Sequence, residues 1–240
     1  MNETAADHVT AISSMATRQL LAALGEACEQ RGGLSIRLES VGGVDAARRV
    51  RDGESFDLVV LAAEAIDALL AAGHVIAGSC RPIAVSSVAI AVRAGVDPPD
   101  VASEEALRRA VLSARRIGYS TGPSGTALLK LFARWGLDAC FHERLVQARA
   151  GTPVAALLAS GQADFGFQQF SELKDEAGVT LLGPMPPGLE IATTFVCAIG
   201  AGSSRAAEAA AVLDFMASPA ADGTRQRYGM ARAETSESLA

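Results

Sequence analysis

The chain has 240 residues, of which 50% are hydrophobic and 20% charged. This length allows one large domain or two lobes of about 100 residues each. The formal net charge is −6 and no segment concentrates the basic residues, which excludes a scaffold for nucleic acid. A small anion stays compatible with this charge, because backbone N–H groups, hydroxyls and one or two arginines can hold it locally.

Membrane insertion and a bound metal are not expected. No window of 18 apolar residues is free of charge, and the cysteines are far apart without a CxxC pair. Glu3 and Asp7 stand where an export signal would need Lys or Arg. The sequence thus predicts a cytoplasmic protein, or a periplasmic one if a native leader was trimmed, without a cofactor.

The first third of the chain alternates short apolar strands with amphipathic helices. The predicted strands are 8–12, 34–41 and 57–61, and the predicted helices are 14–30, 44–51 and 63–72. The chain has 48 alanines and only 5% aromatic residues, and a core poor in rings suits helices packed on buried strands. This pattern predicts a parallel α/β layer.

A second strand–helix series follows a long β-rich run at 82–93. The predicted helices of this series are 103–114, 126–135 and 153–160, and the predicted strands are 116–120, 145–147, 164–167 and 179–182. A strand at 191–199 and a helix at 204–216 close the pattern.

The fold class predicted from this order is α/β, with two Rossmann-like lobes. The chain is expected to cross between the lobes twice, near residues 82–92 and 184–194, in a double-crossover hinge. Lobe I would hold 1–83, lobe II 84–190, and residues 191–240 would return to lobe I. A cleft between the lobes would then be the place for a ligand.

Four loops share one design, in which a strand ends and a helix opens with small or hydroxyl residues. Each loop offers unpaired N–H groups at the positive end of a helix. The candidate ligand-binding residues of these loops, together with an arginine one turn into the first helix, are Ser13, Ser14, Arg18, Gly42, Gly43, Thr121, Ser124, Gly125, Thr126, Gly151 and Thr152.

Gln168 and Gln169 follow the predicted strand 164–167, where their amides could donate to a carboxylate or an oxyanion. A catalytic residue is unknown from the sequence, because no Ser-His-Asp arrangement, HExxH motif or paired carboxylates can be placed. Glu39, Tyr119 and His74 are the candidates for a base.

The order of these patterns resembles the molybdate-binding branch of the type 2 periplasmic solute-binding proteins. The matching stretches are ISSMAT, ARRVRDGESFDLVVLA, PIAVSSVAIAVR and SGQADFGF, and the likeness covers about residues 8–230. The resemblance implies a periplasmic binding protein fold of type 2 and ligand contacts in the loops above. This chain departs from the family at Gly42-Gly43, where a serine is usual, and at Gln169, where a tyrosine is usual.

Two functions follow from the resemblance. The first is a substrate-binding protein that closes on a small anion, an oxyanion or a di- or tricarboxylate, with an ABC permease as partner if the protein is exported. The alternative is a cytoplasmic isomerase of an unsaturated polycarboxylate, because the superfamily is similar to an aconitate isomerase on the same scaffold. Whether the chain is an enzyme stays open at this point.

Overall fold

The computed structural model describes residues 8–32, 34–137 and 139–233. The described residues divide into two compact units, of which unit 1 holds those up to 85 and from 194 onward, and unit 2 holds those from 86 to 193. Residues 1–7 and 234–240, which the prediction assigned to the first lobe, lie outside the described residues. The chain passes between the units twice, within β4 (Arg81–Arg93) and β9 (Ala192–Ile199), and this confirms the predicted double crossover. A cleft between the units stays a prediction.

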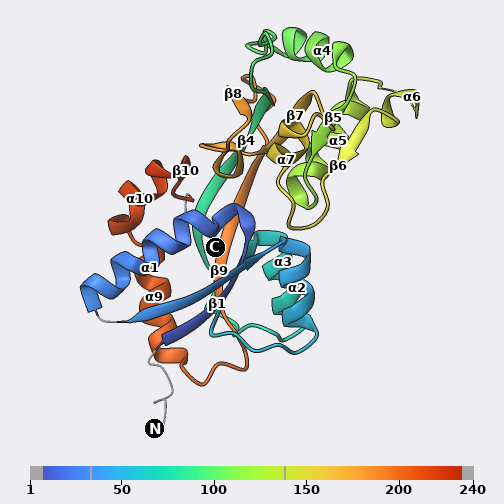
Figure 1. The fold of residues 1–240 in the computed structure, drawn as a ribbon. Coiled ribbons are helices and arrows are strands. Elements are labelled where there is room, and N and C mark those ends of the chain that lie inside the picture. Colours follow the sequence, from blue (N-terminus) through green and yellow to red (C-terminus); the bar gives the residue numbers. More distant parts are fainter. Residues whose placement is uncertain (1–7, 33, 138, 234–240) are drawn as a thin grey trace. The chain divides into compact units, whose positions relative to one another are not determined.

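Unit 1 is a sheet with helices on both faces. Its strands follow the order β2 (Ser35–Val41), β1 (His8–Ser14), β3 (Leu58–Ala62) and β9. β1 is parallel to β2 and β3, whereas β9 is antiparallel to β3. One face carries α1 (Arg18–Gly32) and α9 (Ala206–Ala217), and the other carries α2 (Gly43–Arg51) and α3 (Ala63–Ala71), as Figure 1 shows.

The apolar run of β3 explains this double layer. All five residues of β3 are buried. Leu58 and Val60 pack with α1 and α9, while Val59 and Leu61 pack with α2 and α3. A strand covered on both faces needs apolar residues at every position, which is why the run showed no alternation.

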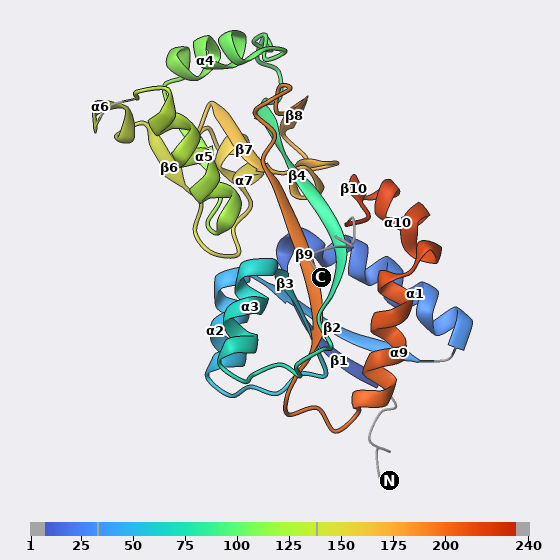
Figure 2. The ribbon, with the colours of Figure 1, turned by 180° about the vertical axis from the view of Figure 1, so that it is seen from behind.

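The strands of unit 2 follow the order β8 (Val179–Pro184), β4, β7 (Phe165–Gln169), β5 (Ile117–Tyr119) and β6 (Leu145–Gln147). β5 is parallel to β6 and β7, and β4 is antiparallel to β7 and β8. One face packs on α4 (Glu104–Ser113) and α5 (Pro123–Arg134), and the other on α7 (Val154–Ala159) and α8 (Phe170–Leu173). The elements of this unit are labelled in Figure 2, together with the short α6 (Ala139–His142).

Three differences from the predicted elements affect the candidate site. The first helix is preceded by a 3₁₀ turn, η1 (Met15–Thr17), so β1 continues to Ser14. α5 begins at Pro123 and not at Thr126, because Gly122 takes a φ of +88° and the fixed φ of Pro suits the first helical position. β7 extends to Gln169, so the two glutamines lie inside the strand and not after it.

The C-terminal part of unit 1 was not predicted. It consists of η2 (Pro219–Ala221), α10 (Asp222–Arg227) and β10 (Met230–Ala231). Arg225 is fully buried there, and its guanidinium donates to the carbonyl oxygens of Ile83, Ser218 and Met216 and pairs with Asp222. This one side chain ties the end of α9 to the start of β4.

Candidate functional site

The carboxyl ends of three strands of unit 1 meet at one edge of its sheet. β1 runs into η1 and α1, β2 into α2, and β3 into α3. The register of β1 with β2 pairs Ser14 with Val41, so the two loops leave the sheet side by side. Because the first N–H groups of a helix have no partner inside it, this edge gathers hydrogen-bond donors with partial positive charge.

Ser13 and Ser14, which the sequence treats as equivalent candidates, differ in the structure. The Ser13 hydroxyl lies 2.8 Å from the Ser40 hydroxyl and donates to the Ser14 carbonyl oxygen at 3.2 Å. The Ser14 hydroxyl is buried and has no hydrogen-bond partner among the described residues, and Ser14 as a whole is only 7% exposed. A buried hydroxyl without a partner is unfavourable, which marks Ser14 and not Ser13 as the group that a ligand would satisfy.

Gly42 and Gly43 place the N-terminus of α2 against Ser14. Gly42 is the N-cap, and its carbonyl accepts the Ala46 N–H at 2.9 Å. A Cβ at position 43 would lie 3.4 Å from the Cβ of Ser14. The glycine pair therefore lets the first turn of α2 approach Ser14 closely. Arg18 is exposed at the first residue of α1.

The corresponding edge of unit 2 is formed by the loop from β5 to α5. The hydroxyls of Ser120 and Ser124 lie 3.1 Å apart, and Ser124 is buried in the first turn of α5. A Cβ on Gly125 would overlap the carbonyl oxygen of Ser120, so only glycine fits there. The predicted loop thus forms a compact helix N-terminus with two hydroxyls beside it, and the half-buried Thr121 lies in the same loop.

Other predicted residues of unit 2 are engaged within the protein. The Thr126 hydroxyl donates to the Gly122 carbonyl of its own helix at 3.2 Å. Gly151 and Thr152 are exposed, in a turn that leads to α7. The first N–H of α7, on Val154, already donates to the side-chain oxygen of Gln168 at 2.6 Å. The protein therefore satisfies the donor that the sequence offered to a ligand here.

Gln168 and Gln169 are both buried, and they point to opposite faces of β7 because strand side chains alternate. The Gln168 amide also donates to Glu172 at 2.8 Å. Burial raises the pKa of Glu172 from 4.5 to about 7, and the bond from Gln168 offsets part of this rise. Gln169 donates to the Thr193 hydroxyl at 2.8 Å, while its own side-chain oxygen is buried without a partner among the described residues.

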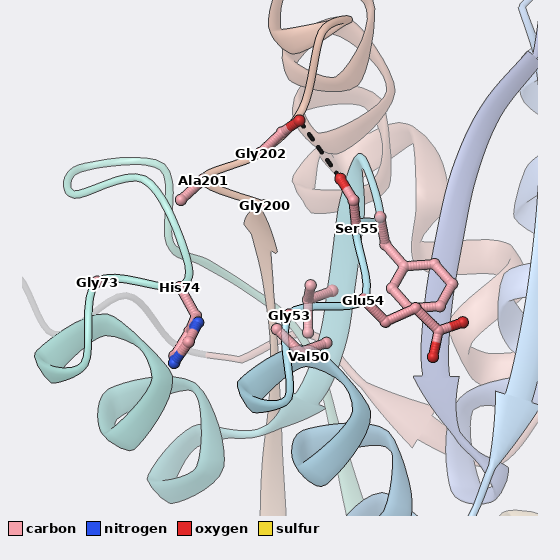
Figure 3. Close-up of a pocket in the computed structure, with 11 residues that line it drawn as sticks. Val50, Gly53, Glu54, Ser55, Gly73, His74, Gly200, Ala201 and Gly202 are labelled. Carbon is pink, nitrogen blue, oxygen red and sulfur yellow. Dashed lines mark hydrogen bonds between the residues drawn. The ribbon is translucent and has the colours of Figure 1, made fainter.

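The structure also separates the three candidates for a base. Arg49 binds Glu39 at 2.5 Å and holds the pKa of that carboxyl below its usual range, so Glu39 is a poor proton acceptor near neutral pH. His74 lines a cavity with Ser55 and Gly202 (Figure 3). This cavity lies at the start of β3, whereas Ser14 lies at the end of the parallel strand β1. Tyr119 ends β5 directly before Ser120, so it is the candidate that lies beside the loop leading to the N-terminus of α5.

Sequence reasoning missed Ser86, Glu172 and Thr193, three polar residues with partly or fully buried side chains in unit 2. The signal for Ser86 was a serine pair inside the apolar run PIAVSSVAIAVR. Within the described ranges, no three His, Cys, Asp or Glu residues gather as a metal site would need, and no helix is long and apolar enough to cross a membrane.

Two α/β units joined by two crossing strands, each with helix N-termini at a strand edge, define the class of two-lobed binding proteins. The sequence pattern of the bacterial extracellular solute-binding proteins matches residues 9–231, and the chain belongs to this family.

Solved structures agree with this fold. The chain is similar to the periplasmic molybdate-binding protein of Azotobacter vinelandii, with a TM-score of 0.78, 18% identity, and coverage of 94% of this chain and 100% of that one. It is also similar to a sulfate-binding protein of Mycobacterium tuberculosis, with a TM-score of 0.74, 21% identity, and coverage of 94% and 86%. Identities this low show the fold alone, and the predicted type 2 periplasmic binding protein fold is confirmed.

A closer relative in sequence is an aconitate isomerase of a Pseudomonas species, 34% identical over 173 residues. The match covers 71% of this chain and 65% of the length of that relative.

Proposed function

We propose that this protein binds a small anion as a solute-binding protein. The observation that carries the proposal is the buried Ser14 hydroxyl, which lacks a partner among the described residues and lies against the N-terminus of α2. A hydroxyl in such a place is satisfied when an anion oxygen accepts its proton. The family of the chain supports a binding role.

The groups that would attract an anion are a few hydrogen-bond donors in two loops. In unit 1 the donors are the Ser14 hydroxyl and the first turn of α2, and in unit 2 they are the Ser120 and Ser124 hydroxyls and the first turn of α5. Helix N-termini stabilise negative charge without a basic side chain. A net charge of −6 over the whole chain is therefore compatible with an anionic ligand.

The test is calorimetry and thermal shift against molybdate, tungstate, sulfate, phosphate and di- and tricarboxylates. We expect at least one of these anions to stabilise the protein, and we expect the double variant Ser14→Ala/Ser124→Ala to lose most of that stabilisation. The matched control is Ser103→Ala, which removes the N-cap of α4, where the Ser103 hydroxyl accepts the Ala106 N–H. The control should cost stability but leave anion affinity unchanged. Undiminished affinity in the double variant would refute the site.

A solute-binding protein that serves transport passes its ligand to a membrane partner. For an exported, periplasmic form we propose an ABC permease as that partner, whereas a cytoplasmic form would suit the alternative function below. Fractionation of cells that express the full gene, followed by co-purification with permease subunits, tests both proposals.

The alternative is an isomerase of an unsaturated polycarboxylate, and the observation that favours it is the 34% identity to an aconitate isomerase. Such a reaction removes a proton from one carbon and returns a proton to another, so it needs a group that exchanges protons near neutral pH. Burial raises the pKa of Glu172 to about 7, which suits such a proton exchange. The Gln168 amide donates to Glu172 and accepts the first N–H of α7, and so connects the two.

The cis-aconitate assay separates the two functions. The isomerase function predicts that the trans isomer forms over time in the NMR spectrum, and that Glu172→Gln slows its formation. If wild-type protein binds cis-aconitate measurably but forms no trans isomer over time, the isomerase function is refuted and only the binding function remains.

A further inference from the structure

Three neutral polar side chains form a cluster at one end of the sheet of unit 2. Gln169 on β7 donates to the Thr193 hydroxyl on β9 at 2.8 Å. The remaining oxygen of the Gln169 amide is buried, and so is the hydroxyl of Ser86 on β4. Neither atom has a hydrogen-bond partner among the described residues. The cluster, defined as Ser86, Gln169 and Thr193, thus keeps two unsatisfied polar atoms inside the protein.

The register of the sheet places Gln169 beside the anion-binding edge of unit 2. Phe167 pairs with Tyr119, the last residue of β5, so Gln169 is level with Thr121 in the loop that leads to α5. Because strand side chains alternate, Gln169 shares a face with Phe167. The Phe167 ring lies 5.8 Å from the Phe132 ring of α5. Gln169 therefore lies on the α5 side of the sheet, near the N-terminus of that helix.

Ser86 lies on the same face of the neighbouring strand. Val88 of β4 pairs with Gln169 in antiparallel register, and Ser86 is two residues before Val88. This makes Ser86 and Gln169 diagonal neighbours, which in sheets are about 7–8 Å apart. The antiparallel direction places Ser86 beyond the carboxyl end of β7, at the same edge of the sheet as the loop that leads to α5.

The cluster carries no charge, and its strands carry none nearby: the segments 86–92, 165–169 and 191–193 contain no Asp, Glu, Lys or Arg. A hydroxyl and an amide together offer both a donor and an acceptor. A tetrahedral oxyanion needs donors only, and the first turn of α5 with the adjacent Ser120 and Ser124 hydroxyls supplies these. A donor and acceptor pair instead fits a hydroxyl or a protonated carboxyl group, which both donates and accepts.

We propose that Ser86 and Gln169 form a subsite for a second polar group of the ligand, so that the ligand is an organic acid with a hydroxyl or a further, protonated carboxyl group and not a tetrahedral inorganic oxyanion. This inference rests on the proposed anion-binding function and names its ligand class. The charged end of the acid binds at the N-terminus of α5, and its second polar group satisfies the two buried atoms.

The test is calorimetry with citrate, tricarballylate and sulfate as probes. Citrate and tricarballylate share three carboxylates and differ by one hydroxyl. Wild-type protein should bind both acids more tightly than sulfate. Ser86→Ala should weaken binding of the better of the two acids by about tenfold, the effect of one lost hydrogen bond in a buried site, and should leave sulfate binding unchanged. The matched control is Ser87→Ala, on the exposed neighbour of Ser86, and it should change nothing.

Gln169→Met is the second variant, because it keeps the length of the side chain and removes the amide. Gln169→Met should weaken binding of the organic acid by a similar factor. If neither variant changes the affinity for the acids, or if sulfate binds as tightly as the acids, the subsite is refuted. Loss of sulfate binding in Ser14→Ala would still support the anion-binding function in that case. If wild-type protein binds none of the three probes nor any anion of the wider panel, the anion-binding function fails and the subsite fails with it.

Discussion

Replacement of Ser14 by alanine should stabilise the ligand-free protein and at the same time weaken ligand binding. The Ser14 hydroxyl is buried without a partner among the described residues. Such a group costs about 1–3 kcal/mol, and the methyl of alanine does not carry this cost. Part of the gain is lost because the removed oxygen leaves a small void. We therefore expect the free energy of unfolding to rise by about 1 kcal/mol.

The adjacent Ser13 is the matched control, because it is also a buried serine but its hydroxyl is hydrogen-bonded within the protein. Ser13 is fully buried, and its hydroxyl lies 2.8 Å from the Ser40 hydroxyl. Ser13→Ala removes this hydrogen bond and should lower the free energy of unfolding by about 1 kcal/mol. Two neighbouring Ser→Ala changes should thus shift the stability of the protein in opposite directions.

Urea unfolding of the ligand-free protein, followed by circular dichroism, measures both effects as shifts in the midpoint at constant slope. The same titrations with a saturating anion should reverse the order of Ser14→Ala and wild type, because a ligand stabilises only the form that binds it. Two results would contradict this prediction: a Ser14→Ala variant that is less stable than wild type without ligand, or a Ser13→Ala variant that loses anion affinity as strongly as Ser14→Ala does.

Three further predictions concern groups outside the Ser14 edge. Between pH 4.5 and 7 the folded protein keeps Glu172 protonated, whereas the unfolded chain does not, so the free energy of unfolding should fall by at most about 3 kcal/mol as pH rises through this range. Glu172→Gln should remove this pH dependence of stability in urea titrations. An unchanged pH dependence in the variant contradicts the raised pKa of Glu172. Gly125→Ala should destabilise by about 2 kcal/mol or more, because its Cβ overlaps a backbone carbonyl, whereas Gly223→Ala in α10 has open space and should be neutral or stabilising in thermal melts. Arg225→Met should destabilise by about 3 kcal/mol or more in the same melts, since it leaves buried carbonyls unpaired, and a loss below about 1 kcal/mol would show that solvent reaches them.

Much of the architecture could be predicted from local patterns. The apolar run of β3 and the spacing of Leu20, Leu21 and Leu24 in α1 depend on which face each residue buries, and burial follows directly from the period of the sequence. The C-terminal η2, α10 and β10 could not be predicted in this way, because one buried arginine bound to distant carbonyls organises them. A contact between Arg225 and Ile83 spans 142 residues and leaves no local signal.

Local sequence patterns were enough to predict the α/β class and the two crossings of the chain, and they indicate the loops in which we propose that a ligand binds. Which side chains in those loops keep a free hydrogen-bonding group depends on the tertiary structure. Ser13 and Ser14 are identical in sequence terms, yet Ser40 satisfies one and leaves the other without a partner. Gln168 likewise closes the start of α7, while Gln169 keeps an unsatisfied oxygen. The reason is that availability depends on hydrogen bonds between segments far apart in the chain, whereas the type of each element depends on residues close together in it.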